Sequence, residues 1–151
     1  IKGEDIKVVE FNARFGDPET QVVLPLLACD LVEVMLACAQ GRLHEVKVEW
    51  SDSATVCVVM ASGGYPGSYE QCLPITGLAE ANSLSDTIVF HAGTKEIGDT
   101  IVTAGGRVLG VTATGSDIRA AKDKAYAAVK LIDFKDAHYR HDIAWRALKD
   151  K

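Results

Sequence analysis

A near-continuous apolar run from Ala54 to Ala61 constrains the fold of this chain more than any other stretch. Its residues do not alternate with polar ones, so the run is typical of a β-strand that is buried on both faces of its sheet. The residue pattern changes shortly before this run, because apolar residues begin to alternate with polar ones from His44 onward. We therefore predict a boundary near Glu49, with one unit at residues 1–49 and a separate β-rich domain at residues 50–151.

The second unit is predicted to hold several short strands and one long helix. Further strands are expected at residues 73–76, 88–92, 101–103 and 107–113, where apolar and β-branched residues stand between turn residues. After Ser116, a suitable N-cap, an apolar stripe at helical spacing predicts a helix. The members of that stripe are Ile118, Ala121, Ala125, Val129 and Ile132. The fold class is therefore α+β.

The first stretch of the chain carries the side chains with the clearest chemistry. If residues 8–14 form a strand, Glu10, Asn12 and Arg14 project from one face, because successive side chains alternate. A carboxylate and an amide oxygen are hard ligands that suit Mg²⁺ or Mn²⁺ beside nucleotide phosphates. A guanidinium can hold an anion or stabilise charge that develops during group transfer. The same three residues could equally form the solvent-exposed face of an amphipathic edge strand.

Two helices are expected after this strand. Pro18 would begin the first helix, with Asp17 as its N-cap after a tight turn at Gly16, and such a helix start favours anions. Pro25 would kink or end that helix, because proline removes a backbone donor and clashes with the preceding turn. The stretch Asp30–Gly41 has the N-cap pattern and the C-terminal glycine of a second helix.

Composition excludes several classes of function. The 151 residues carry a net charge of −5, so the chain lacks the basic face of a nucleic-acid-binding protein. No apolar run is long enough to span a bilayer, and a membrane partner is not expected. The cysteines show no zinc spacing and lie among apolar residues, which predicts buried, reduced thiols in a cytoplasmic protein. They are Cys29, Cys38, Cys57 and Cys72.

Several motifs resemble those of a known enzyme family. The Glu-x-Asn-x-Arg pattern of residues 10–14 resembles the metal-binding strand of the ATP-grasp ligases. The longer string Arg14–Gln21, running on into Val22–Leu27, resembles one family of them, the phosphoribosylamine–glycine ligases, or glycinamide ribonucleotide synthetases. Four more strings resemble the C-terminal domain of that family. They are Gly63–Gly67, Phe90–Thr94, Gly105–Leu109 and Tyr139–Ile143.

This resemblance implies a reaction and a set of site residues. ATP, glycine and 5-phosphoribosylamine would give glycinamide ribonucleotide, ADP and phosphate in purine synthesis, through a glycyl phosphate. Glu10 and Asn12 would hold Mg²⁺ or Mn²⁺ on the phosphates of ATP, and Arg14 would stabilise the acyl phosphate. The residues expected at the substrate-side turn are Gly16, Asp17 and Glu19.

Two of these assignments have a second interpretation. Asp17 could orient glycine or the sugar amine, or it could only cap the first helix. Arg107 could reach a substrate phosphate, or it could form an ordinary surface salt bridge.

The resemblance also implies an architecture. Residues 1–49 would be the end of the ATP-grasp core, with one strand and two helices, and residues 50–151 would be a small β-rich C-terminal domain with one long helix. The glycine-rich lid, the adenine-binding hinge and the N-terminal domain of such ligases are not visible in the sequence. The start without Met suggests an excised piece, and we expect the chain to need the missing N-terminal part of the same enzyme and to be inactive alone.

Two alternatives remain open. The chain could belong to another ATP-grasp ligase or carboxylase that acts on a different acid or amine. It could also be a non-enzymatic β-rich module that docks on a partner.

Overall fold

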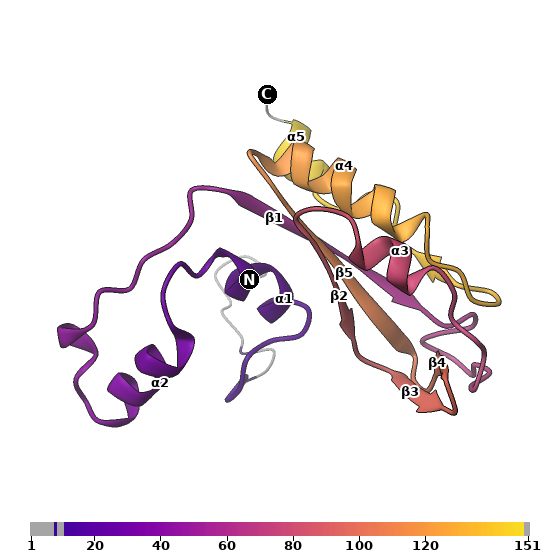
Figure 1. The fold of residues 1–151 in the computed structure, drawn as a ribbon, viewed down its shortest axis with the longest axis horizontal. Helices are drawn as coiled ribbons and strands as arrows, with labels where there is room; N and C mark the ends of the chain where they lie inside the picture. The colour runs from indigo at the N-terminus through magenta and orange to yellow at the C-terminus, as the bar shows by residue number, and fades with distance from the viewer. Residues whose placement is uncertain (1–7, 9–10, 150–151) are drawn as a thin grey trace.

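The structure, a computed structural model, describes residue 8 and residues 11–149 (Figure 1). Its centre is a four-stranded antiparallel sheet with the strand order β2–β5–β1–β6, and a two-stranded hairpin of β3 and β4 adjoins it. The bounds are β1 Ala54–Ala61, β2 Thr87–His91, β3 Thr94–Ile97, β4 Thr100–Thr103, β5 Arg107–Gly115 and β6 His138–Tyr139. The predicted α+β class is confirmed.

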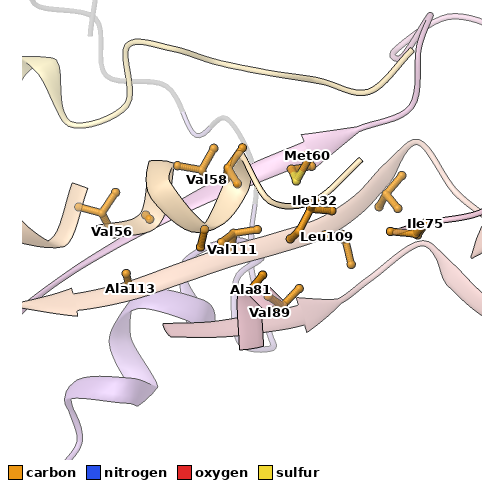
Figure 2. Packing of buried hydrophobic residues seen from close by; sticks show 14 of the residues in the cluster. Val56, Val58, Met60, Ile75, Ala81, Val89, Leu109, Val111, Ala113 and Ile132 are labelled. Atoms are coloured by element: carbon orange, nitrogen blue, oxygen red, sulfur yellow. The ribbon is translucent and has the colours of Figure 1, made fainter. Parts of the chain in front are cut away.

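The sheet is built around β1 and β5. β1 has the bounds of the predicted apolar run, and it pairs with β5 over nearly its whole length, with Val58 opposite Val111. On the other side of β5, Val111 is also opposite Val89 of β2. Three valines therefore lie side by side across the sheet, and Figure 2 shows their side chains among the buried residues.

Helix α4 (Ile118–Val129) covers one face of this sheet, together with α3 (Leu78–Asn82) (Figure 1). Ala121 and Ala125 are fully buried on α4, and their small side chains let the helix approach the strands closely. The N-cap of α4 is Asp117, whose carboxylate accepts a hydrogen bond from the Ala120 amide at 2.8 Å, and not the predicted Ser116. A short helix, α5 (Trp145–Lys149), follows near the C-terminus.

Helix α1 (Thr20–Val23) lies on the opposite face (Figure 1). The hydroxyl of Thr55 donates to the backbone oxygen of Val22 at 2.6 Å, which ties α1 to the start of β1. Since side chains alternate along a strand, Thr55 and Cys57 face α1 while Val56 and Val58 face α4. β1 is thus covered on both faces, as its composition predicts.

The predicted strand at residues 8–14 is not present in the described part of the segment. Residues 11–19 form neither helix nor strand, and Glu10 lies outside the described residues. A strand needs a neighbouring strand to pair its backbone groups. The described residues place no strand beside this segment, which accounts for the difference.

The first helix begins later than predicted. α1 starts at Thr20 rather than Pro18, and its N-cap is Glu19 rather than Asp17. The Glu19 side chain accepts no capping hydrogen bond from the described residues. The prediction for Pro25 is confirmed, because the α-helix ends before it and a 3₁₀ turn, η1 (Leu24–Leu26), follows.

The second predicted helix is confirmed as α2 (Leu31–Ala39). The carboxylate of Asp30 caps it by accepting from the amides of Val32 at 2.7 Å and Glu33 at 3.3 Å. Gly41, with a φ of +69°, follows its end, and a 3₁₀ turn, η2 (Leu43–Glu45), comes next.

Two smaller expectations are wrong. Residues 73–76 form isolated bridges instead of a strand, and Pro74 lacks the amide proton that a ladder requires. β3 was not expected. All four cysteines are free, but only Cys57 is buried, whereas Cys38 and Cys72 are exposed.

Within residues 8 and 11–149, no helix is long and apolar enough to cross a membrane.

Candidate functional site

Five of the six candidate site residues line one cavity of about 350 Å³. All five come from the segment that leads into α1: Asn12, Arg14, Gly16, Asp17 and Glu19. The sixth, Glu10, lies outside the described residues. The structure therefore brings the predicted amide, guanidinium and carboxylates together around a single space.

The turn before α1 shapes this cavity. The backbone oxygen of Gly16 accepts hydrogen bonds from the Thr20 amide at 3.0 Å and from the Thr20 hydroxyl. The backbone oxygen of Glu19 accepts from the amides of Val22 and Val23 at 3.1 and 3.0 Å. A Cβ atom added to Gly16 would meet the Glu19 side chain, so glycine leaves room for that carboxylate.

Asn12 and Arg14 are exposed on the cavity wall. Nη1 of Arg14 donates to the backbone oxygen of Phe15 at 3.1 Å, which holds one arm of the guanidinium beside its own chain. A guanidinium has five N–H donors, so this bond leaves others for an anion. The Arg14 side of the cavity therefore suits a negatively charged group of a ligand.

Asp17 is held by two side chains from outside the turn. Nη1 of Arg107 donates to the backbone oxygen of Asp17 at 3.0 Å, and Nη2 lies 3.1 Å from its Oδ2. Nε2 of Gln21 donates to Oδ1 at 2.9 Å. The Arg107 and Asp17 side chains are 41% and 43% exposed, so the ion pair itself is worth about 1 kcal/mol or less. Asp17 is thus fastened to β5 and does not cap α1.

A second cavity, of about 390 Å³, lies between the turn and the end of β2. Its lining includes Gly16 and Asp17 from the turn and Phe90, His91 and Ala92 from β2 and its end. Nδ1 of His91 lies 3.0 Å from the Thr94 hydroxyl. Sequence reasoning assigned no role to His91, and its only signal was the family-like string Phe90–Thr94.

The buried side chain of Cys57, which lies on β1 beneath α1, is uncharged at neutral pH. Burial raises the pKa of the Cys57 thiol, the Thr112 hydroxyl opposes that rise, and the negative charge of Asp17 adds to it. The thiol therefore stays protonated at neutral pH and is a poor nucleophile. The buried Oε1 of Gln21 finds no hydrogen-bond partner among the described residues.

The donor set of the cavity suits a hard cation better than a soft one. In the described part of the chain, no group of three or more His, Cys, Asp or Glu residues is placed to hold a metal ion. Mg²⁺ needs only one or two protein oxygens when phosphates and waters supply the rest. Asn12, Asp17 and Glu19 offer oxygen ligands around the cavity.

An apolar cavity of about 420 Å³ separates α2 from α1 and the segment that precedes β1. Its lining includes an apolar stripe of α2 at helical spacing, formed by Leu31, Val34, Met35 and Cys38. This stripe is not buried, because Met35 is 51% exposed, and Val32 beside it is 71% exposed. Among the residues of α2, only Ala37 is buried.

Comparisons with known proteins identify relatives. The family model described as "Phosphoribosylglycinamide synthetase, C domain" matches residues 55–146. The phosphoribosylamine–glycine ligase of a Nostoc species is 54% identical over 144 residues, which cover 94% of this chain and 34% of that protein. The chloroplastic phosphoribosylamine–glycine ligase of Arabidopsis thaliana is 49% identical over 147 residues, which cover 96% of this chain and 28% of that protein.

A solved structure agrees with these matches. The crystal structure of phosphoribosylamine–glycine ligase from Thermotoga maritima is similar with a TM-score of 0.69 and 33% sequence identity, over 89% of this chain and 32% of that one. The chain spans about a third of the length of the curated relatives it matches. The comparisons confirm the family resemblance that the motifs indicate.

Proposed function

The chain belongs to the family of the phosphoribosylglycinamide synthetase C domain, and on that premise we propose that it is the C-terminal part of a phosphoribosylamine–glycine ligase. The proposed reaction uses ATP to join glycine to 5-phosphoribosylamine, giving glycinamide ribonucleotide, ADP and phosphate in purine biosynthesis. The observation that carries the proposal is the polar cavity of the Asn12–Glu19 segment, in the same chain as residues 55–146, which match the family model.

We assign the metal to the start of the site. Glu10 and Asn12 would hold Mg²⁺ or Mn²⁺, because oxygen donors suit these ions beside phosphates. The bound ion would neutralise phosphate charge and orient the γ-phosphoryl group for transfer to the glycine carboxylate. The exposed oxygen donors around the cavity support this assignment.

Arg14 is the proposed catalytic residue. Its guanidinium would stabilise the negative charge that builds on the phosphoryl group during transfer, and then the glycyl phosphate. Its bond to the Phe15 backbone oxygen restricts the side chain before the substrate arrives, so less conformational entropy is lost on binding.

Gly16, Asp17 and Glu19 form the proposed substrate-side wall. The carboxylate of Asp17 would orient the ammonium group of glycine or the amine of the sugar. Its Oδ1 accepts one hydrogen bond and its Oδ2 forms one ion pair within the chain, and each oxygen retains a lone pair for a ligand. The Glu19 carboxylate would add negative charge on the same side.

We propose that the preceding part of the same ligase packs on the apolar surface of α2. The cavity lined by the α2 stripe and the exposure of Val32 and Met35 support this, because monomeric proteins rarely leave large apolar patches open. That part would also supply the adenine-binding and lid elements, so the 151 residues alone would not turn over. Four free cysteines are typical of a reducing compartment and support a cytoplasmic location.

The test is ADP release by the protein of the native reading frame that contains this chain. Release should require both glycine and 5-phosphoribosylamine, and Glu10→Gln should abolish it. Glu96→Gln, which removes an exposed carboxylate from β3, is the matched control and should leave release unchanged. Release with a different acid or amine would instead identify another ATP-grasp ligase. If no combination supports release, the proposal fails, and the result favours the non-enzymatic binding module.

A further inference from the structure

We propose that Arg107 is a positioning residue for the Asn12–Glu19 cavity, because it fastens the turn of residues 16–19 to the start of β5. This inference rests on the proposed function and extends it to a residue far from the site motif in sequence. Of the two roles expected from the sequence, the surface salt bridge is observed, with Asp17 as its partner, and a hydrogen bond to the Asp17 backbone oxygen accompanies it. The guanidinium is engaged by the turn instead of standing free for a phosphate, and the pair joins segments that are 90 residues apart.

The contact has the geometry of a two-point clamp. One nitrogen of the guanidinium holds the Asp17 backbone oxygen at 3.0 Å, and another lies 3.1 Å from its carboxylate. A planar guanidinium that makes two separate contacts fixes orientation as well as distance. Since one contact is to the main chain, the clamp constrains the backbone of the turn itself. Gln21 restrains the remaining carboxylate oxygen from the α1 side.

The turn lies outside the regular secondary structure. Residues 11–19 have no regular secondary structure, and α1, the helix they lead into, has four residues. The anchor is rigid by comparison, because Val108 and Leu109, which follow Arg107 in β5, are almost completely buried. The clamp therefore transfers the rigidity of the sheet to the turn.

The position of the turn determines the shape of the site. Gly16 and Asp17 line both the 350 Å³ cavity and the 390 Å³ cavity, so a displacement of the turn would change the shape of both. A displacement of about 1 Å in a group that positions substrate can reduce a rate roughly 100-fold. Arg107 would thus affect the reaction without touching a reacting atom.

Hydrogen exchange on the 151-residue chain tests the clamp without any assumption about activity. The amides of Thr20, Val22 and Val23 bond to the backbone oxygens of Gly16 and Glu19 and report on the turn. Arg107→Ala should speed their exchange by roughly five- to tenfold, through the loss of one backbone hydrogen bond and one ion pair. Arg119→Ala removes an exposed arginine from α4 and should leave the turn unchanged.

Kinetics of the native reading frame test the consequence for the reaction. Arg107→Ala should lower kcat for ADP release by roughly 10- to 100-fold while the KM values change little. Arg107→Lys keeps the charge but not the planar fork, so it should restore only part of the rate. Arg119→Ala should match the wild type.

The outcomes separate this inference from the proposed function. Unchanged exchange at the turn overturns the clamp, and so does an active enzyme whose kcat is unaffected by Arg107→Ala. A raised KM for phosphoribosylamine at constant kcat overturns it in favour of phosphate binding by Arg107. If the wild type releases no ADP but Arg107→Ala still loosens the turn, the proposed function fails and the clamp stands.

Discussion

Substitution of Val111 by alanine probes the core that supports the site. Val111 and Val58 are fully buried, and Val89 is 6% exposed, with Val111 opposite both in the sheet. Removing two methyl groups costs about 1.6 kcal/mol in transfer free energy. The backbone ladders on both sides limit collapse into the space, so a cavity cost of about 1 kcal/mol adds to this. We therefore expect a loss of about 2.5 kcal/mol.

Urea unfolding of the 151-residue chain measures this loss. The midpoint should fall at constant slope, and the melting temperature should fall by roughly 5–10 °C. Val32→Ala deletes the same atoms at a residue that is 71% exposed, and should change the free energy of unfolding by less than about 0.5 kcal/mol. If Val111→Ala costs no more than Val32→Ala, the packing of β1, β5 and β2 is not as described.

Three further predictions concern a glycine, a thiol and the apolar surface. Gly77→Ala should destabilise the chain by several kcal/mol in urea unfolding, because Gly77 has a φ of +77° and a Cβ there would collide with the Leu131 backbone oxygen. Gly98→Ala is the control and should cost only about 1 kcal/mol, because Gly98 has a φ of +58° but open space around it. Equal costs for the two variants would contradict the close approach of Gly77 to Leu131. Burial raises the pKa of Cys57 in the folded state, so above about pH 8.5 the unfolded chain loses a proton that the folded chain keeps, and stability should fall as pH rises. Cys57→Ala should flatten that slope in unfolding measured from pH 7 to pH 10, and an unchanged slope would refute the assignment. Met35→Lys should change the free energy of unfolding of the 151-residue chain by less than about 0.5 kcal/mol, because Met35 is exposed there. In the protein from the native reading frame it should lower the melting temperature, because a lysine would then lie in the proposed interface of α2. Equal effects in the two proteins would exclude α2 as a packing surface.

Patterns that depend on local chemistry were predictable from the sequence. The apolar run of β1, the Asp30 cap of α2 and the alanine-rich stripe of α4 each specify an element through nearby residues alone. β3 was missed because Thr94–Ile97 is short, polar and mostly exposed, and so carries no apolar alternation. The strand expected at residues 8–14 depended on a pairing partner, which local pattern cannot supply.

The candidate site also has a part that could be predicted from the sequence and a part that could not. The residue types around the cavity could be chosen from the motif, because they lie within one short segment. The link from Asp17 to Arg107 could not, since two residues 90 positions apart carry no local signal of contact. The second cavity, with His91, also depends on how the turn meets β2.

The most direct test of the proposed ligase is to follow the carboxylate oxygens of glycine. If glycine is activated as glycyl phosphate, a carboxylate oxygen bonds to the γ-phosphorus of ATP, and attack by the amine then breaks the carbon–oxygen bond. The protein from the native reading frame, given glycine labelled with oxygen-18 in the carboxylate, should transfer one labelled oxygen to phosphate for each glycinamide ribonucleotide formed. Unlabelled phosphate, or phosphate released without the amide product, would contradict the account.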